Sequence, residues 1–595
     1  LSHEASGNSA GYGEMASAAS KIEVPEEVEL KKISDFSIIG TSRKNVDGKK
    51  IVTGKPLFGL DVQREGMLIA SLVHPPAFGM KLKSFDAEAA KQMPGIRDVF
   101  SIKLYDDDYK KMAFHFTAFN ELVVVVGDST WQVFQAKKAL KIEWENNADI
   151  TDTMTMFGND MKVTFPAGME NSESHTAKLK ELTSLNAKVA RKDGNPEAAF
   201  KSAAKIIERS YSCPFLAHNT MEPMNFFAHV TEDHAELLGP TQTPEWMESA
   251  VSEVLGLPLE KIDIQMTRQG GGFGRRLYGH FMVEVAAISK RMSAPVKLVY
   301  SREDDMTQGI YRPAYYATYR AAFDADNKLT AFHVKAGGIP ESPLFANRFP
   351  AGAIDNYLAE DFTVDSNITT GAFRAPRSNF IAGAEQSFLD EVAEEMGKDP
   401  IDFRLELLKR AEENPVGEKE SNDYDAARYA GVLELVREKS NWKQTESGVH
   451  RGVSAYFCHQ SYVAQVLDII MENNKPVVQK VTAAIDCGIV VNPDAASNLS
   501  EGGVIDGIGH AMYSGLTFKD GMPEQSNFDR YRLIRHKEAP KSIETHFVQS
   551  EIDPTGMGEP PFPPIMGALA NALYKVTGQR HYHQPFITEK PPLIG

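Results

Sequence analysis

The sequence predicts a multidomain chain that mixes α+β and α/β architecture. It has 595 residues, and because compact domains hold roughly 150 residues each, about three or four domains are expected. Hydrophobic residues make up 42% and charged residues 24%, a globular composition that excludes collagen-like, disordered and coiled-coil chains. Short β-rich runs precede residue 145, and strands alternate with helices after Pro196, as a large α/β or α+β body requires.

Charge and cysteine content exclude several functional classes. The net charge of −17 disfavours binding to nucleic acid, since phosphate backbones need a dense basic face. Cys213, Cys458 and Cys487 have no paired spacing, so we expect no thiolate-held cluster, and any iron–sulfur cluster belongs to another chain. The longest aliphatic run, Leu122 to Val126, is far shorter than the roughly 20 residues that span a bilayer. We read this run as a buried strand and predict no membrane span in this chain.

The pattern along the chain predicts five regions. Residues 1–45 are read as a surface connector that continues a missing N-terminal region, 46–150 as a small α+β domain, 151–195 as a polar linker, and 196–445 and 446–595 as the two parts of a large body. Within the small domain, strands are predicted at 67–73, 99–102 and 122–126, and a helix at 130–140.

The first of four candidate loops is rich in glycine. It runs Arg268-Gln269-Gly270-Gly271-Gly272-Phe273-Gly274-Arg275-Arg276, between an alternating strand at 262–266 and a helix with apolar positions Leu277, Phe281, Val285 and Ile288. Backbone without side chains can approach a ligand closely, and the N–H groups, the positive end of the helix and the two arginines favour an anion such as a phosphate. A tight turn with solvated arginines is an equally good interpretation of this loop alone.

Two further loops each precede a helix. Gly371-Ala372-Phe373-Arg374-Ala375-Pro376-Arg377 leads to a helix predicted from about Ser378 to Met396, where Arg374 orients a substrate carbonyl or, on the favoured alternative, bonds loop carbonyls. The segment from Asp486 to Pro493 leads to a helical stretch over 498–513 with glycines at 502, 503, 507 and 509, which allow close helix packing or contact with a cofactor. Cys487 is interpreted as buried packing.

The fourth loop, Gly556-Met557-Gly558-Glu559-Pro560-Pro561-Phe562-Pro563-Pro564, places one carboxylate among poorly solvating neighbours. Glu559 is a candidate general base with a tunable pKa, although a salt-bridged or solvent-facing glutamate is the favoured interpretation of the loop alone. His218 and Glu222 are interpreted as structural hydrogen-bonding residues, because no third metal ligand is evident, and residues 581–583 as solvated surface.

Taken in order, these four loops and Gly239-Pro240-Thr241-Gln242 resemble the large, molybdenum-cofactor-binding subunit of the xanthine oxidase family. The likeness is greatest to its isoquinoline 1-oxidoreductase and membrane-associated aldehyde dehydrogenase branch, and it runs from about Gly7 to Ile587. The resemblance implies a small hammerhead-like α+β domain followed by a large two-part molybdenum-cofactor-binding body.

The same resemblance implies the site and its chemistry. The metal is held by the pterin dithiolene, so no protein metal ligand is expected, and Glu559 is the base. The cofactor-binding residues implied are Gln242, Gly271, Gly272, Phe273, Gly274, Arg275, Ala372, Phe373, Arg374, Gly502 and Gly503. The implied reaction inserts water-derived oxygen at an electrophilic carbon of an aldehyde or N-heteroaromatic substrate and passes electrons to the [2Fe-2S] clusters of a small partner subunit.

Two departures from the family pattern stand out. Leu499 occupies a position that usually holds a glutamine, and no Met-Gly-Gln-Gly cofactor loop occurs in the 595 residues. We therefore expect an N-terminal fragment or separate chain to complete the cofactor pocket. The branch further suggests a molybdopterin cytosine dinucleotide, a cytochrome c acceptor and a periplasmic location, with a cytoplasmic one as the alternative. A non-catalytic assembly or anion-binding subunit that keeps the fold is the second hypothesis.

Overall fold

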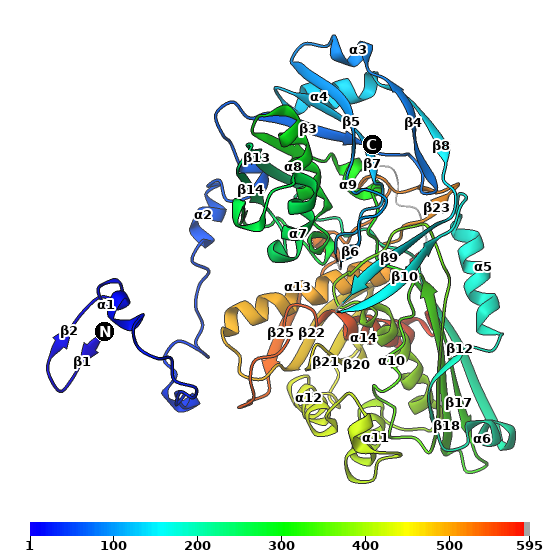
Figure 1. Cartoon of the computed structure of the whole chain (residues 1–595). Helices are drawn as coiled ribbons and strands as arrows, with labels where there is room; N and C mark the ends of the chain where they lie inside the picture. Colours follow the sequence, from blue (N-terminus) through cyan, green and yellow to red (C-terminus); the bar gives the residue numbers. More distant parts are fainter. Residues whose placement is uncertain (113, 157, 588–595) are drawn as a thin grey trace.

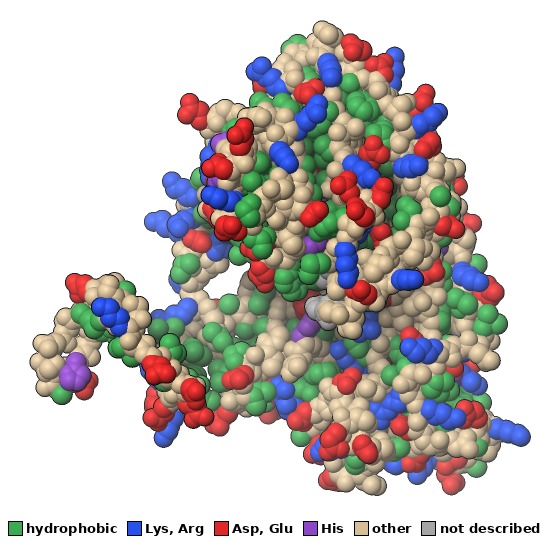
Figure 2. Space-filling view, in the orientation of Figure 1, with side chains coloured by type: hydrophobic (Ala, Val, Ile, Leu, Met, Phe, Trp, Pro, Cys, Tyr) green, Lys and Arg blue, Asp and Glu red, His purple; other side chains and the backbone are tan. Residues whose placement is uncertain are grey.

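The computed structural model describes residues 1–112, 114–156 and 158–587 (Figure 1). The end of the region predicted at 446–595, residues 588–595, lies outside the described residues. Residues 1–45, predicted as a connector, form an exposed arm whose first part extends away from the body (Figures 1 and 2). Near its end the arm meets the body, where Gly40 donates to the carbonyl oxygen of Val491 and Arg43 exchanges hydrogen bonds with Asn492. Its elements are β1 (Ser2–His3), β2 (Asn8–Ser9) and α1 (Tyr12–Ala19), followed by α2 (Gly48–Val52) where the chain reaches the body.

The first sheet combines strands of the predicted small domain with strands of the later body. Its order is β15-β14-β13-β16-β3-β7-β5. The strands are β3 (Leu68–Val73), β5 (Ile96–Lys103), β7 (Glu121–Gly127), β13 (Asn225–Val230), β14 (Ala235–Gly239), β15 (Ile262–Met266) and β16 (Val296–Val299). Because a buried strand must bond its backbone on both edges, β3 pairs with β7 on one side and in parallel with β16 on the other. The region 46–150 therefore has no main sheet of its own, which differs from the separate small domain that we predicted.

The continuous apolar run of β7 is buried on both faces, as predicted. Val123 and Val125 pack into a small core with Val133 and Ala136 of α4 (Thr130–Ala139). Leu122, Val124 and Val126 face the main core of the molecule. The small core is completed by α3 (Glu88–Lys91) and by the two-stranded ribbon of β4 (Met80–Asp86) and β8 (Lys141–Asn146).

The predicted polar linker over 151–195 has regular structure along most of its length. It contains β9 (Ile150–Met156), β10 (Asn159–Phe165), α5 (Ser172–Thr183) and β11 (Lys188–Asp193), and β9 also pairs with the short β6 (Lys111–Met112). Only His175 and Leu179 of α5 are buried, so the segment lacks the apolar period by which such elements are recognised in a sequence.

The second sheet has the order β11-β19-β18-β17-β12. Its longer strands are β12 (Lys205–Cys213), β17 (Ala314–Phe323), β18 (Leu329–Ile339) and β19 (Asn356–Thr363). The predicted helix after Arg377 is found as α10 (Ser378–Glu395), which is buried along nearly all its length. The other α-helices between residues 196 and 413 are α6 (Pro196–Ser202), α7 (Pro244–Leu255), α8 (His280–Met292), α9 (Arg302–Thr307) and α11 (Pro400–Glu413).

The third sheet, β20-β21-β22-β25, belongs to the C-terminal part. Its strands are β20 (His450–Cys458), β21 (Ser461–Glu472), β22 (Lys475–Asp486) and β25 (Ser542–Phe547), and β23 (Phe518–Lys519) and β24 (Met522–Pro523) form a separate small ribbon. Helices α12 (Ala426–Lys439) and α14 (Phe562–Thr577) pack on this sheet, and α14 also packs on α10.

Helix α13 (Pro493–Met512) lies between the first and third sheets in the view of Figure 1. It begins earlier than the predicted 498, because Asn492 caps it by accepting from Ala495 N and Pro493 occupies its first turn. None of the helices in the described ranges is long and apolar enough to cross a lipid bilayer. On the face shown in Figure 2, acidic and basic side chains are interspersed.

Candidate functional site

The glycine loop between β15 and α8 packs against two of the other predicted loops. Its backbone is left-handed at Gly271 (φ +98°), Phe273 (φ +55°) and Gly274 (φ +104°). A Cβ on Gly272 would lie 2.6 Å from Gln242 Oε1, and one on Gly274 would lie 2.1 Å from the carbonyl oxygen of Ala372. The amide of Gly274 also donates to Gln242 Oε1 at 3.3 Å. Contacts within the protein therefore require glycine at Gly274, where the neighbour is backbone, whereas at Gly272 the side chain of Gln242 could shift.

The two arginines that follow this loop point into the protein, contrary to our expectation of paired phosphate donors or solvated side chains. Arg276 donates to the carbonyl oxygens of Gly271 and Glu222, each at 2.7 Å. Arg275 Nη2 lies 3.2 Å from Nε2 of His280, whose pKa burial lowers well below its usual range, so the neutral ring accepts this bond. The reason for the difference is that interior carbonyls and a neutral imidazole offer acceptors to both guanidinium groups.

The loop at 371–377 is bound to the glycine loop through its backbone. The amide of Arg374 donates to the carbonyl oxygen of Phe273 at 2.9 Å, and His218 Nε2 donates to the carbonyl oxygen of Ala372 at 2.8 Å. Burial lowers the pKa of His218 to about 3, so the ring is neutral at physiological pH. Glu222 accepts from the amide of Gly270 at 2.7 Å. His218 and Glu222 are thus hydrogen-bonding residues that shape the loops, as the sequence indicated.

Arg374 joins three loops through one buried guanidinium group. It donates to the carbonyl oxygen of Gly558 at 2.6 Å, to Asp506 Oδ2 at 3.2 Å and to the carbonyl oxygen of Leu499 at 3.4 Å. Its side chain is 9% exposed. The interpretation of Arg374 as a residue that bonds loop carbonyls is confirmed, and these bonds bring the 371–377 loop, α13 and the loop before α14 together.

Glu559 lies at this junction with each carboxylate oxygen engaged. Oε1 accepts from the amide of Ala375 at 2.7 Å, and Oε2 lies 2.7 Å from His459 Nε2, while the side chain remains 39% exposed. Burial acts to raise the pKa of Glu559, but the hydrogen bond and charge of His459, the Ala375 amide and Arg374 together lower it. Glu559 is therefore an ionised, salt-bridged and partly exposed carboxylate, which is the interpretation that the loop alone favoured. Its fixed orientation among these loops is the geometry that a proton acceptor would need.

The two predicted glycines of α13 differ in their surroundings. A Cβ on Gly503 would lie 3.1 Å from Pro561 Cβ, so this glycine permits close contact with the start of α14. A Cβ on Gly502 would meet no atom within 4 Å, so protein packing does not explain this glycine. The side chain of Leu499, one turn earlier, is 41% exposed.

Sequence reasoning missed His459, His510 and Phe562. The ring centroids of His510 and Phe562 lie 5.3 and 6.4 Å from that of Phe373, and His510 Nε2 pairs with Asp506 at 3.0 Å. The available signal for His459 was its position in a two-residue connection between strands, but nothing in the sequence indicates that it meets a residue 100 positions later. For Cys487, burial raises the pKa of its thiol to about 11, in keeping with a packing role.

The polar groups around these loops suit a ligand rich in ring nitrogen and carbonyl oxygen, such as a pterin. Buried polar atoms without a partner among the described residues include His218 Nδ1, both amide atoms of Asn219, Ser500 Oγ and His510 Nδ1. Across the same residues, no group of three His, Cys, Asp or Glu side chains is placed to ligate a metal. The residues present therefore fit a cofactor that brings its own metal ligands.

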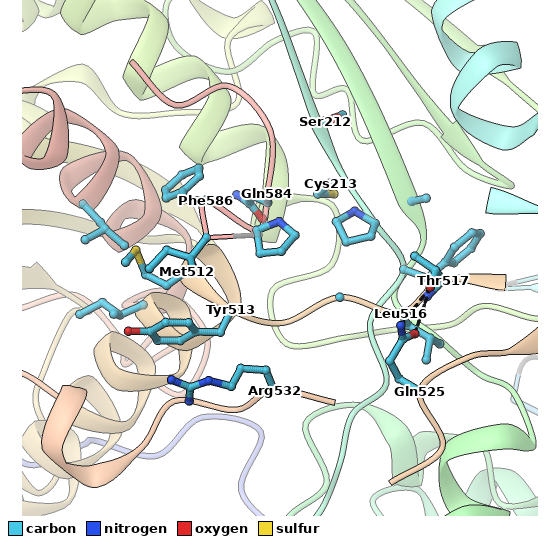
Figure 3. A pocket seen from close by; sticks show the side chains of 18 of the residues that line it. Ser212, Cys213, Met512, Tyr513, Leu516, Thr517, Gln525, Arg532, Gln584 and Phe586 are labelled. Carbon is cyan, nitrogen blue, oxygen red and sulfur yellow. Dashed lines mark hydrogen bonds between the residues drawn. The ribbon is translucent and has the colours of Figure 1, made fainter. Parts of the chain in front are cut away.

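A cavity of about 1190 Å³ lies away from these loops (Figure 3). Its lining includes Ser212 and Cys213 of β12, Met512 at the end of α13 and Gln584 and Phe586 near the C-terminus, but none of the predicted site residues. In the adjoining segment, expected to be solvated surface, His581 and Tyr582 are half-buried and His583 is exposed, so the expectation is wrong for the first two residues. Tyr582 accepts from Arg209 and His583 bonds Ser212, each at 2.9 Å, so this segment packs on β12.

Comparison with known proteins supports a molybdenum cofactor. Residues 180–408 and 389–540 match molybdopterin cofactor-binding domain families. The chain is 28% identical to the membrane-bound aldehyde dehydrogenase [pyrroloquinoline-quinone] of Gluconacetobacter polyoxogenes, over 94% of this chain and 74% of that protein. It is 27% identical to the isoquinoline 1-oxidoreductase subunit beta of Brevundimonas diminuta, over 93% of this chain and 68% of that subunit.

Solved structures show the same fold. Quinoline 2-oxidoreductase from Pseudomonas putida 86 superposes with a TM-score of 0.72 at 14% identity, covering 95% of this chain and 100% of that one. The matched regions together span 180–540, more than half of the 595 residues, and include every predicted site residue except Glu559. The chain belongs to the xanthine oxidase family of molybdenum-dependent oxidoreductases, as a molybdopterin-binding large subunit.

Proposed function

We propose that this chain is the catalytic subunit of a molybdenum hydroxylase that inserts water-derived oxygen at an electrophilic carbon of an aldehyde or N-heteroaromatic substrate. The observation that carries the proposal is the position of Glu559, an ionised carboxylate at the point where the glycine loop, the 371–377 loop, α13 and the entry to α14 meet. Relatives named aldehyde dehydrogenase and isoquinoline oxidoreductase support the two substrate classes.

The residues of this chain have distinct roles in such a reaction. A bound molybdenum cofactor supplies an activated water-derived oxygen and accepts two electrons from the substrate. We assign the following residues to holding it: Gln242, the loop from Gly271 to Arg275, Ala372 to Arg374, Gly502 and Gly503. The side chains of Arg275 and Arg374 are bound within the protein, so these two residues would act by shaping the loops. Glu559 accepts a proton at Oε2 while the amide of Ala375 holds Oε1 at 2.7 Å and fixes the plane of the carboxylate.

Electrons must leave this chain through a partner. All three cysteines are buried and unpaired, which supports our proposal that the [2Fe-2S] clusters lie in a separate small subunit, with a cytochrome c as final acceptor.

The family likeness is also the basis on which we propose the cytosine dinucleotide form of the cofactor. A periplasmic location, with a cytoplasmic one as the alternative, has the same basis. Fractionation of cells, with activity measured in each compartment, tests it.

An additional segment is proposed to complete the cofactor pocket, supplied by a longer form of this chain or by another polypeptide. Phe273 and Leu499 are each 41% exposed, and a Cβ on Gly502 or on Gly558 would meet no atom within 4 Å. These positions have unfilled space or exposed side chains, and two of them, Phe273 and Gly502, are residues at which the family likeness predicts cofactor contact.

Replacing the proposed base tests the function directly. Glu559→Gln keeps the shape of the side chain but removes the proton acceptor, so we expect kcat to fall by about 10² or more with molybdenum content unchanged. Glu551→Gln, which makes the same charge change at an exposed position of the preceding loop, should leave kcat within about two-fold of the wild type. Turnover by the Glu559 variant within a few-fold of the wild type would contradict the assignment.

The second candidate is a non-catalytic assembly or anion-binding subunit that has kept the fold. Leu499, at a position where the family usually carries glutamine, favours it. Metal analysis of the purified native assembly separates the two, because one molybdenum per large subunit supports the enzyme and none supports the scaffold. The same preparation assayed for pyrroloquinoline quinone tests the cofactor that appears in the name of one relative.

A further inference from the structure

The hairpin turn between β20 and β21 carries a histidine in an unfavourable backbone conformation. The turn consists of His459 and Gln460 alone, and both have positive φ, +49° and +61°. Two-residue turns of this type strongly prefer asparagine and glycine, because a side chain on a left-handed residue crowds the backbone. A histidine here needs a reason, and backbone strain of this kind clusters at functional sites.

The turn is fixed to the loop that bears Glu559 by several contacts. The amide of Gly556 donates to the carbonyl oxygen of His459 at 3.1 Å, and a Cβ on Gly556 would lie 2.6 Å from the Cβ of His459. Ser461, next to the turn, donates to the carbonyl oxygen of Gly556 and lies 2.7 Å from Thr555 Oγ1. The turn and the loop are therefore held together by contacts at and next to His459, whose imidazole lies against the carboxylate of Glu559.

The imidazole binds Oε2 of Glu559, the carboxylate oxygen that we propose as the proton acceptor. Nε2 of His459 lies 2.7 Å from Oε2 of Glu559, while Oε1 is held by the backbone amide of Ala375. Both side chains are partly exposed, 45% for His459 and 39% for Glu559, so solvent and small molecules reach the pair. A carboxylate bound to a cation is a weaker base than a free one, so the charge of this histidine affects how readily Glu559 accepts a proton.

We propose that His459 is the positioning residue of Glu559: its imidazolium keeps the carboxylate ionised and oriented, and sets the pH at which Glu559 works as a base. The inference rests on the proposed function, because it gives His459 this role only where Glu559 is the base. No atom of His459 needs to touch the substrate. The proton passes from the reacting group directly to Glu559.

Other charged groups around the pair act in the same direction or are already neutralised. Arg374, from the 371–377 loop, also lowers the pKa of Glu559. Asp506 and His510, from α13, pair with each other at 3.0 Å, and Asp506 binds Arg374 at 3.2 Å. Cys458, the last residue of β20, and Glu559 together raise the pKa of the His459 imidazole to about 10. Among these groups, His459 is the cation in direct contact with Oε2.

Separate substitutions of the two turn residues distinguish the effect of the His459 charge from the effect of its place in the hairpin. Asparagine tolerates a left-handed backbone, is uncharged and is too short to reach Glu559, so His459→Asn should preserve the turn. We expect the acidic limb of its kcat/KM profile to move to higher pH by about one unit or more, because the pKa of Glu559 rises when the cation is lost. Gln460→Asn changes the neighbouring turn residue and should leave the profile in place, and His459→Lys, which restores a cation, should move the limb back toward the wild type.

A measurement that needs no turnover checks the pair itself. In the purified assembly with isotope-labelled histidine, the NMR titration of His459, assigned by its loss in His459→Asn, should show a pKa well above the ordinary value in the wild type. In Glu559→Gln this pKa should fall by about one unit or more. An unchanged titration in Glu559→Gln, or an unshifted acidic limb in His459→Asn, overturns the inference while the proposed function stands. Near-normal turnover by Glu559→Gln overturns the proposed function instead.

Discussion

At the scale of single residues, two glutamates are buried away from the site and are uncharged near neutral pH. Glu284 on α8 is fully buried and accepts from the hydroxyl of Tyr300 at 2.5 Å. Burial raises its pKa to about 8, against an ordinary value of 4.5, and burial likewise raises that of Glu385 on α10 to about 8. Such carboxyls are stable inside a protein only in the protonated form.

This burial makes stability depend on pH. The folded state holds the proton of Glu284 more tightly than the unfolded state, so its contribution is full below about pH 4.5 and is lost as pH rises to about 8. Glu284→Gln removes this loss of folding stability, which for a single group has a limiting slope of about 1.4 kcal/mol per pH unit. We expect the fall in thermal midpoint between about pH 5 and pH 8 to be smaller in this variant than in the wild type. An equal fall in both proteins would contradict the assignment.

Some residues of the site could be predicted from the sequence, and others depend on contacts between distant parts of the chain. Gln242, Arg374 and Glu559 were predicted as site residues from the family resemblance, since their loops taken alone favoured structural roles or gave no signal, and the structure brings them to one junction. His459 was not predicted, because its role depends on a hairpin turn meeting a loop distant in sequence. The direction of Arg276 was also not predictable, since its acceptors, such as the carbonyl oxygen of Glu222, come from another part of the chain.

At the scale of elements, α13 offers a paired test of its glycines. Gly502 is an exposed helical residue with open space around it, so Gly502→Ala should stabilise the cofactor-free chain by about 0.5–1 kcal/mol. A Cβ on Gly507 would lie 2.3 Å from Ile565 Cγ2, so Gly507→Ala should destabilise it by about 1–3 kcal/mol. Thermal midpoints of the two variants check both signs.

The same pair tests cofactor contact. Lower molybdenum content in Gly502→Ala, despite a higher thermal midpoint, would show that the cofactor lies against this glycine. Normal molybdenum content in a stabilised variant would remove Gly502 from the cofactor site.

Elements with a strong apolar period were predictable and the others were not. The sequence patterns of the helices found as α4 and α10 predicted their bounds to within one residue at each end. The region 151–195 was taken for a linker, because its ribbon and α5 expose most of their side chains and receive their order from neighbouring elements. Pairing of β3 with β16 could not be predicted, since no local pattern records which distant strand completes a sheet.

At the scale of the whole molecule, the shared first sheet predicts that the N-terminal region and the body fold together. A chain that begins at residue 151 would lose β3, β5 and β7 and expose the edge of β16, so we expect it to be insoluble. A chain that begins at residue 46 loses the exposed arm and the few hydrogen bonds of Gly40 and Arg43 with Val491 and Asn492, and it should remain soluble with a thermal midpoint near that of the full chain. Expression of the two truncations side by side gives the answer, and a soluble, cooperatively folded 151–595 would refute the prediction.

The crossing of α13 and α14 has a mechanical consequence for the whole assembly. Gly503 lies against Pro561 and the backbone of Phe562 at the start of α14, and Gly507 leaves room for the side chain of Ile565, so the two helices pack closely. Neither helix can slide along its neighbour without collision, so the start of α14 is preorganised. If Glu559 acts as the base that we propose, a substrate must adjust its own pose to a carboxylate held on this rigid entry, and rate differences between substrates should reflect how well each one fits.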